Sequence, residues 1–292
     1  MYRIENEQLS VTINPVGAEI TSIYNKQADF EYIWQGVQWP KHAPVLFPAI
    51  GRSNEDAYLI DGKMYEMPQH GFVADQHFTL EAQTTTSLSL KLVANETTLQ
   101  YYPYHFELII GLQLAADQVH FTATVNNLEN QDLSFSFGSH PAFNVPINDE
   151  GYFDDYQITF ETPEDEVRYF EIVKTPNPYR SGKLCTLKHV ENKTVPLTHK
   201  IFEKGLLIIE NQLAGIKLTS EKSAHSIGLD LGDFKYLTLW TKEGADAPFL
   251  CLEPFYGLPD VAGDKRELST KEANYHLAAK ETASIGYTMT FK

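Results

Sequence analysis

Short apolar runs with a two-residue period recur along the chain, and no other feature restricts its fold as strongly. Leu88, Leu90 and Leu92 alternate with polar residues, and residues 119–125 repeat the pattern. Such alternation is typical of a β-strand that buries one face and exposes the other. Strands are predicted in the same way for residues 9–13, 30–34, 106–114, 133–137, 206–209, 216–218, 227–231, 236–240 and 285–291. The chain is therefore expected to fold mainly into strands.

Helical periodicity, by contrast, is sparse. Residues 270–280 are the strongest candidate for an amphipathic helix, and we expect helix in fewer than about a tenth of the residues. Glycine, proline and asparagine separate the strand-like runs, which favours an all-β sandwich or barrel. The sequence has neither a low-complexity linker nor a repeat of 20–50 residues. Residues 1–292 are therefore expected to form one domain.

Charge and cysteine content narrow the partners and the compartment. Lys and Arg number 23 against 39 Asp and Glu, a net charge of −16, which disfavours nucleic acid and anionic membranes as partners. No apolar run approaches the ~20 residues of a membrane span, and the N-terminus begins with strand-like sequence rather than the apolar core of a secretory signal. Cys185 and Cys251 lie in apolar or strand-like contexts and are expected to be reduced thiols. A cytoplasmic location is expected.

One carboxylate follows a strongly apolar strand. Residues 248–252 read as a buried strand, and Glu253 comes next, directly before Pro254. Because proline lacks the N–H that would continue a sheet, we expect Glu253 at the end of this strand, with aromatic residues nearby. Burial raises the pKa of a glutamate toward the range of a general base near neutral pH. The alternative is a glutamate that caps a loop or pairs with a lysine.

Two of the ten histidines occupy unusual positions. His140 ends an alternating strand and precedes Pro141, so its backbone is restricted in the same way as that of Glu253. His70 lies between Pro68-Gln69 and Gly71. A catalytic site needs such rigidity to hold an acid and a base toward one substrate. The alternative is a histidine of the core or surface, which is our interpretation of the other eight. The spacing matches no short metal-binding signature and no phosphate-binding glycine loop.

An arginine, a tryptophan and two long irregular stretches complete the candidate site. Arg52 ends a proline-framed apolar stretch and can bind vicinal hydroxyls or a carboxylate, or form an ion pair within its loop. Trp240 ends a predicted strand and offers an indole face for stacking on a sugar. Residues 35–56 and 143–156 are long and weakly patterned, as functional loops often are. We expect them to supply walls of a site.

Four short stretches in consistent order carry a resemblance to a known family. They are residues 47–52, 68–72, 139–143 and 252–254. Together they resemble the aldose 1-epimerase (galactose mutarotase-like) superfamily, and most of all its LacX-like branch. The resemblance implies a large antiparallel β-sandwich that works without a cofactor or a metal ion. It also implies one domain in the cytoplasm.

The resemblance also implies roles for individual residues. Glu253 is expected to be the general base and His140 the general acid, while His70 and Arg52 contact the sugar. Family members often have a further sugar-binding aspartate before a mid-chain strand, and the corresponding residues here, 201–205, contain none. Glu203, Asp230 and Asp233 are the possible substitutes, and we take Asp233 as a substrate-binding candidate together with Trp240.

The expected function is interconversion of the α and β anomers of a free aldohexose by acid–base ring opening and closure. The expected partner is a small sugar of the glucose or galactose class, bound by a monomer or homodimer. One alternative is a hexose-6-phosphate 1-epimerase, which needs additional cations for the phosphate. Another is a glycosidase that pairs Glu253 with Asp230 or Asp233 at about 5–5.5 or 6.5–9.5 Å. The third is a sugar-binding protein with little turnover.

Overall fold

Antiparallel sheets dominate the structure. The computed structural model describes residues 1–175 and 177–292. Strands account for 48% of the chain and helices for 9%, which confirms both the all-β class and the expected helix content. Because the apolar residues alternate, each strand can place one row of side chains in the core and leave the other row facing outward.

The larger of two main sheets has nine strands in the order β18-β15-β20-β21-β25-β11-β10-β9-β8. Their bounds are Thr194–Pro196, Tyr156–Glu161, Gly215–Ser220, Ile227–Asp230, Thr282–Phe291, Gln118–Asn127, Phe106–Ala115, Ser87–Val93 and Thr79–Gln83. The central strands β10 and β11 alternate between buried and less buried residues, as their sequence pattern predicts.

The second main sheet carries the candidate site. Its order is β17-β16-β19-β22-β23-β13-β5, with β14 pairing to β23 beside β13. The bounds are Tyr179–Thr186, Arg168–Val173, Leu207–Ile209, Tyr236–Trp240, Phe249–Tyr256, Phe137–Ser139, Val45–Leu46 and, for β14, Ala142–Asn144. Seven consecutive residues of β23, from Phe249 to Phe255, are buried, as expected for a strand covered on both faces.

Smaller elements complete the fold. A four-stranded sheet, β1-β2-β3-β4, comprises Tyr2–Glu5, Leu9–Asn14, Glu19–Asn25 and Phe30–Glu31. Two ribbons pair β6 with β7 and β12 with β24, at Ala57–Ile60, Lys63–Glu66, Leu133–Phe135 and Tyr275–Leu277. The α-helix α1 spans Glu96–Tyr101. Short 3₁₀ helices η1 to η6 span Asn54–Asp56, Val73–Asp75, Ile147–Asp149, Phe153–Asp155, His199–Phe202 and Leu268–Thr270.

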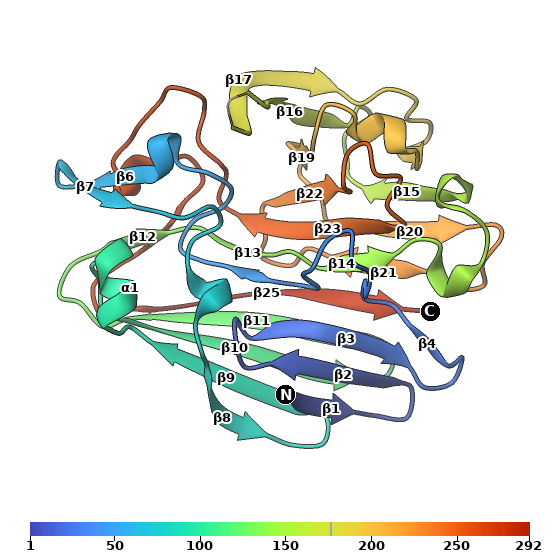
Figure 1. Ribbon diagram of the computed structural model, residues 1–292, viewed down its shortest axis with the longest axis horizontal. Helices are drawn as coiled ribbons and strands as arrows, with labels where there is room; N and C mark the ends of the chain where they lie inside the picture. Colours follow the sequence, from blue (N-terminus) through green and yellow to red (C-terminus); the bar gives the residue numbers. More distant parts are fainter. Residues whose placement is uncertain (176) are drawn as a thin grey trace.

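The two main sheets enclose a shared core. In Figure 1, β22, β23 and β13 lie over β25, β11, β10 and β9. Phe137 of β13 packs against Phe121 of β11, with ring centroids 6.2 Å apart, and the Ser139 hydroxyl lies 2.8 Å from the Tyr287 hydroxyl of β25. These contacts join the sheets directly beneath the strands that carry the site, so the site rests on a packed, rigid base.

Two sequence expectations are wrong in detail. Residues 133–137 form parts of two strands rather than one, since β12 pairs with β24 whereas β13 pairs with β23 and β5. Residues 270–280 do not form a helix. They begin at the last residue of the 3₁₀ turn η6 and continue into β24, where Leu277 is buried against the core. Pairing with β12 therefore outweighs the weak helical pattern.

Glu253 lies within β23 rather than at its end, which also corrects the sequence expectation. Lys235 lies directly before β22, and its backbone N–H donates to the carbonyl of Phe255. The backbone polar groups of Phe255 therefore face β22, and those of its neighbour Pro254 face the opposite side of β23. On that side β13 ends at Ser139 and β14 begins at Ala142. The interruption removes the need for an N–H at Pro254, and the strand continues.

No helix within residues 1–175 and 177–292 combines the length and apolar character needed to cross a membrane. Both cysteines are free thiols, as predicted, with Cys251 buried and Cys185 half-buried. The single-domain organisation stays a prediction.

Candidate active site

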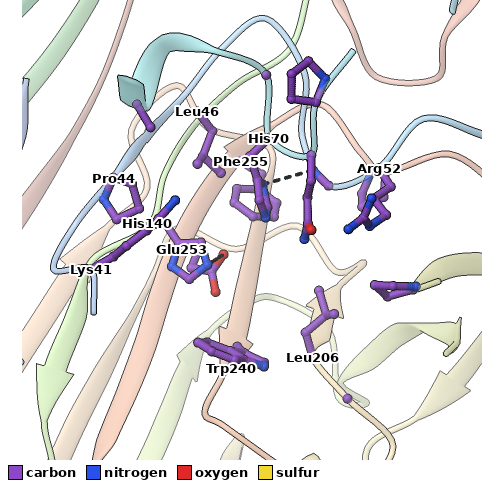
Figure 2. A pocket seen from close by; sticks show the side chains of 18 of the residues that line it. Lys41, Pro44, Leu46, Arg52, His70, His140, Leu206, Trp240, Glu253 and Phe255 are labelled. Atoms are coloured by element: carbon purple, nitrogen blue, oxygen red, sulfur yellow. Dashed lines mark hydrogen bonds and ion pairs between the residues drawn. The ribbon is translucent and has the colours of Figure 1, made fainter. Parts of the chain in front are cut away.

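A cavity of about 590 Å³ opens on the sheet that contains β23. Five of the six site residues predicted from the sequence line it: Arg52, His70, His140, Trp240 and Glu253. They come from distant parts of the chain, and Figure 2 shows Glu253 and His140 side by side, with His70 and Arg52 to one side and Trp240 opposite. A cavity of this size is typical of a small-molecule site.

The imidazole–carboxylate pair lies at the floor of the cavity. The Nε2 atom of His140 is 3.3 Å from the Oε2 atom of Glu253. His140 occupies the break between β13 and β14, next to the strand that carries Glu253. Its backbone N–H donates to the carbonyl of Pro44 at 3.0 Å. The other polar atoms, Oε1 of Glu253 and Nδ1 of His140, are buried without a hydrogen-bond partner among the residues that the structure describes. Buried polar atoms without a partner are costly and frequently mark functional sites.

Burial shifts both pKa values away from the charged forms. Desolvation raises the pKa of Glu253 well above its ordinary value, with the side chain only 2% exposed. Desolvation lowers the pKa of His140 well below its ordinary value, and the nearby His70 and Lys41 lower it further. The pair therefore holds a single proton over a wide range of pH, because taking up a second proton or losing the first leaves a net charge in a buried site.

A tight turn presents His70 to the cavity. The N–H of Gly71 donates to the carbonyl of Pro68 at 2.9 Å, and His70 adopts a left-handed backbone with φ of 66°. That conformation is uncommon for any residue except glycine and often marks a functional position. Only glycine fits at position 71, because a Cβ there would lie 2.1 Å from the carbonyl oxygen of Phe47. The Pro-Gln-His-Gly motif thus places the imidazole of His70 at the cavity.

The protonation of His70 follows from its contacts. Its Nδ1 accepts a hydrogen bond from the N–H of Gly51 at 3.1 Å, so the neutral ring carries its proton on Nε2. Burial, assisted by the positive charges of Lys41 and Arg52, lowers the pKa of His70 to about 4. At neutral pH the side chain is an uncharged hydrogen-bond donor, suited to a sugar oxygen.

Arg52 is held by a buried polar network. The N–H of Asp260 donates to the carbonyl of Arg52 at 3.2 Å, and the Asp260 carboxylate accepts from the N–H of Asn54 at 2.8 Å. The ammonium of Lys271 is 2.8 Å from the other Asp260 oxygen. Gly51 packs so closely on Pro259 that a Cβ would approach to 2.6 Å. The segment that follows β23 therefore fixes the loop that precedes η1.

The guanidinium of Arg52 keeps part of its donor capacity. Its Nη1 is 2.8 Å from Oδ1 of Asp56, an ion pair of the kind that the sequence left open. Its Nε is buried and has no hydrogen-bond partner within residues 1–175 and 177–292. An arginine has five N–H donors, so pairing with one carboxylate leaves donors for a ligand in the cavity.

Aromatic rings enclose the imidazole of His140. Trp39 stacks on it with ring centroids 4.9 Å apart, and Trp240 approaches edge-on at 5.9 Å. Trp39 was not predicted as a site residue, although it belongs to residues 35–56, which we expected to form a wall. That expectation is confirmed, since Trp39, Lys41, Pro44 and Arg52 line the cavity. Residues 143–156 do not line it.

The sequence reading also missed four charged residues that line the cavity: Lys41, Asp75, Lys174 and Glu243. Lys174 and Glu243 form an ion pair of 3.4 Å on the outer wall. They come from sequence without motif character, so their position depends on how β16 and β22 pack and carries no local signal. Lys41 precedes the first recognised motif by a few residues and lies beside His140 in Figure 2.

The remaining predicted carboxylates lie elsewhere. Asp233 accepts a hydrogen bond from the N–H of Gly286 at 3.0 Å and does not line the cavity, which corrects its assignment as a substrate-binding residue. Asp230 accepts from the N–H of Gly232 in the same region and is exposed. Glu203 is exposed, while the following Gly205 and Leu206 reach the cavity. The pairing of Glu253 with Asp230 or Asp233 that a glycosidase would use is therefore not formed.

This fold and site define the class of galactose mutarotase-like β-sandwich proteins. The structure is similar to the crystal structure of a galactose mutarotase-like protein from Lactobacillus casei, with a TM-score of 0.95, 36% identity and full coverage of both chains. It is also similar to a galactose mutarotase related enzyme from Lactobacillus acidophilus, with a TM-score of 0.92, 28% identity, and coverage of 100% of this chain and 97% of that one.

The chain belongs to the aldose 1-epimerase family, whose profile matches residues 1–276. A curated relative is the plasmid-encoded protein LacX of Lactococcus lactis subsp. lactis, 28% identical over 303 residues that cover 98% of each chain. The superfamily and the LacX-like branch expected from the four sequence motifs are thus both confirmed.

Proposed function

We propose that this protein interconverts the α and β anomers of a free aldohexose by general acid–base catalysis. The observation that carries the proposal is the 3.3 Å separation of His140 Nε2 and Glu253 Oε2 at the floor of the cavity. A proton donor and a proton acceptor at that distance can act on two oxygens bonded to the same carbon, and in a cyclic hexose C1 carries both the O1 hydroxyl and the ring oxygen O5.

The reaction is a proton exchange around C1. Glu253 takes the proton of the O1 hydroxyl while His140 donates its proton to O5. The electrons of the O1–H bond form the carbonyl at C1, and the C1–O5 bond breaks with its electron pair on O5. The aldehyde then rotates about C1–C2, and the same steps in reverse close the ring to the other anomer. Each positioned group contributes roughly 10²–10⁴-fold.

In the protein without sugar, the proposed acid and base are neighbours on one side of the cavity. One proton shared by the pair can lie on Glu253 or on His140, and the reactive form has it on His140. The buried site disfavours any net charge on the pair, which favours retention of this one proton at neutral pH. A sugar that enters must part the two groups, so that each bonds to its own oxygen.

Other residues hold and orient the ring. Trp240 offers an aromatic face at the cavity wall for the C–H surface of a sugar. The Nε2–H of His70 and the free donors of Arg52 are suited to hydroxyl oxygens. This arrangement pairs an apolar face with a few fixed donors, as small-molecule sites commonly do.

The proposal is tested by anomer exchange on purified protein. Polarimetry, or NMR exchange between the two C1–H signals, is followed for glucose and galactose with the uncatalysed rate subtracted. Acceleration proportional to protein concentration supports the proposal. Binding without acceleration, measured by calorimetry on the same samples, identifies a sugar-binding protein with little turnover and contradicts it.

Free hexoses are expected to have a higher kcat/KM than their 6-phosphates. The cationic residues Arg52, Lys41 and Lys174 line the cavity. Arg52 and Lys174 are already paired with Asp56 and Glu243, and a phosphate dianion usually requires several unpaired cations. The exchange assay with glucose and glucose 6-phosphate measures this preference. An equal or higher kcat/KM for the phosphate would contradict it and identify a hexose-6-phosphate 1-epimerase.

Arg52→Ala is expected to raise KM by about 10-fold or more and to change kcat little. The guanidinium contributes hydrogen bonds and no proton transfer, so its loss weakens substrate and transition state alike. Steady-state anomer exchange over a range of sugar concentrations separates the two parameters. The control is Arg3→Ala, which removes an exposed arginine paired with Glu5 on β1. A fall in kcat at unchanged KM would assign Arg52 to the chemical step instead.

A further inference from the structure

A buried thiol lies beside the acid–base pair and has no part in the proposed reaction. Cys251 precedes Glu253 by two residues on β23, so both side chains point to the same face of the sheet. The Sγ of Cys251, a ring nitrogen of His140 and a carboxylate oxygen of Glu253 all lie within 4.8 Å of one another. All three residues are buried. A thiol, an imidazole and a carboxylate are the three kinds of side chain that bind zinc.

One separation already matches that around a tetrahedral metal ion, and the other two are at most 4.8 Å. Bonds of about 2.0–2.2 Å to nitrogen and oxygen and about 2.3 Å to sulfur place the ligand atoms about 3.3–3.6 Å apart. His140 Nε2 and Glu253 Oε2 are already separated by 3.3 Å. The sulfur needs to approach by no more than about 1.2 Å to complete three ligands. That movement is within the reach of a change in side-chain rotamer.

The electrostatics of the pocket also suit a divalent cation. Burial disfavours net charge there, and a 2+ ion with one thiolate, one carboxylate and one neutral imidazole has a net charge of zero. A neutral imidazole offers the lone pair of one ring nitrogen as a metal ligand. The ion would reach the site through the cavity, whose wall includes both His140 and Glu253.

We propose that His140, Cys251 and Glu253 form an inhibitory binding site for a zinc-class divalent cation. The thiol and imidazole select zinc-class ions over Mg²⁺ and Ca²⁺, which prefer oxygen ligands. Cys251 binds as the thiolate and releases its proton to solvent. The bound ion occupies the lone pairs of the acid and the base, so it blocks proton exchange. The inhibitory effect depends on the proposed function, whereas the binding of the ion does not.

The test measures ion binding without sugar, and a separate assay follows anomer exchange with and without saturating Zn²⁺. Exchange that Zn²⁺ does not slow overturns the inhibitory role. Zn²⁺ is titrated by calorimetry into the purified protein, into Cys251→Ala and into Cys185→Ala, without sugar. Co²⁺ is used as a spectroscopic probe of thiolate ligation. The Cys185→Ala control removes the other thiol, which is half-buried on β17 and does not line the cavity. Wild type and Cys185→Ala should bind Zn²⁺ equally, and Cys251→Ala at least about 10-fold more weakly.

Three results decide the metal site. Zn²⁺ binding that depends on Cys251, together with a thiolate-to-cobalt charge-transfer band lost in Cys251→Ala, supports it. Equal Zn²⁺ affinity in Cys251→Ala, or a cobalt complex without that band, overturns it. Cys251→Ser, which keeps the size of the side chain, repeats the test if Cys251→Ala is destabilised. If the protein shows no anomer exchange under any condition, the proposed function fails, while calorimetry still decides the metal site.

Discussion

Replacing Glu253 with glutamine is expected to lower kcat for anomer exchange by at least about 10²-fold and to leave sugar binding nearly unchanged. The amide keeps the size and the hydrogen-bonding reach of the side chain, but it has no basic site to take the O1 proton. Burial raises the pKa of Glu253 and thereby makes the carboxylate a stronger base than an exposed one, so the loss falls on the chemical step. NMR exchange gives the rate, and calorimetry gives the sugar affinity of the same preparation.

Stability and matched carboxylates serve as controls for Glu253→Gln. Because Oε1 of Glu253 is buried and has no hydrogen-bond partner in the described part of the chain, a neutral amide should leave the melting temperature equal or higher. Asp230→Asn and Asp233→Asn remove exposed carboxylates that do not line the cavity and should exchange anomers at the wild-type rate. If Glu253→Gln were as fast as wild type, and one of these variants were slow, the base would have been assigned to the wrong carboxylate.

Local sequence patterns predicted much of the sheet structure. They failed where pairing with distant strands determines the bounds and partners of a strand. Strand β22, Tyr236–Trp240, has the bounds that its alternation predicts. Residues 133–137 alternate just as cleanly, yet they divide between two sheets because β12 and β13 have different partners. The proline after Glu253 normally ends a strand, and β23 continues because its neighbour on that side is interrupted. Neither partner choice is visible in the residues of the strand itself.

The short helix α1 was missed although its start carries a local signal. The side chain of Asn95 accepts hydrogen bonds from the N–H groups of Thr97 and Thr98 and forms a capping box. The helix that follows is only six residues long, too short for an amphipathic period to be recognised over about ten residues. Short helices of this kind depend on their caps and tertiary contacts more than on periodicity.

The candidate site was predicted as far as its residues belong to short motifs. Arg52, His70, His140 and Glu253 each lie next to a proline or glycine that restricts the backbone, and all four line one cavity. Glu243 and Lys174 reach the same cavity from unremarkable sequence, since the packing of two strands brings them there. Asp233 was chosen by residue type alone, and its hydrogen bond to the N–H of Gly286 holds it away from the cavity. The roles of Arg52, His70, His140 and Glu253 in binding and catalysis stay predictions.

The pH profile of the wild-type protein is expected to be bell-shaped, with its plateau around neutral pH. The reactive form carries one proton on the pair, with Glu253 ionised and His140 protonated. Activity should rise with pH as the doubly protonated pair loses a proton at the lowered pKa of His140. It should fall at higher pH as the last proton leaves at the raised pKa of Glu253. The profile of kcat/KM, corrected for the uncatalysed rate, measures both limbs.

His140→Asn is expected to lower kcat by at least about 10²-fold and to reverse the sign of the alkaline limb. Without the imidazole, the remaining catalyst is the Glu253 carboxylate alone, so activity should rise as pH passes through the raised pKa of Glu253, where wild type falls. His105→Asn is the matched control, because His105 pairs with Glu129 at 2.7 Å on the surface, and it should keep the wild-type profile. An alkaline limb that still falls in His140→Asn would mean that another group donates the proton to O5. His70 and Lys41, which line the same cavity, would then be the residues to replace next.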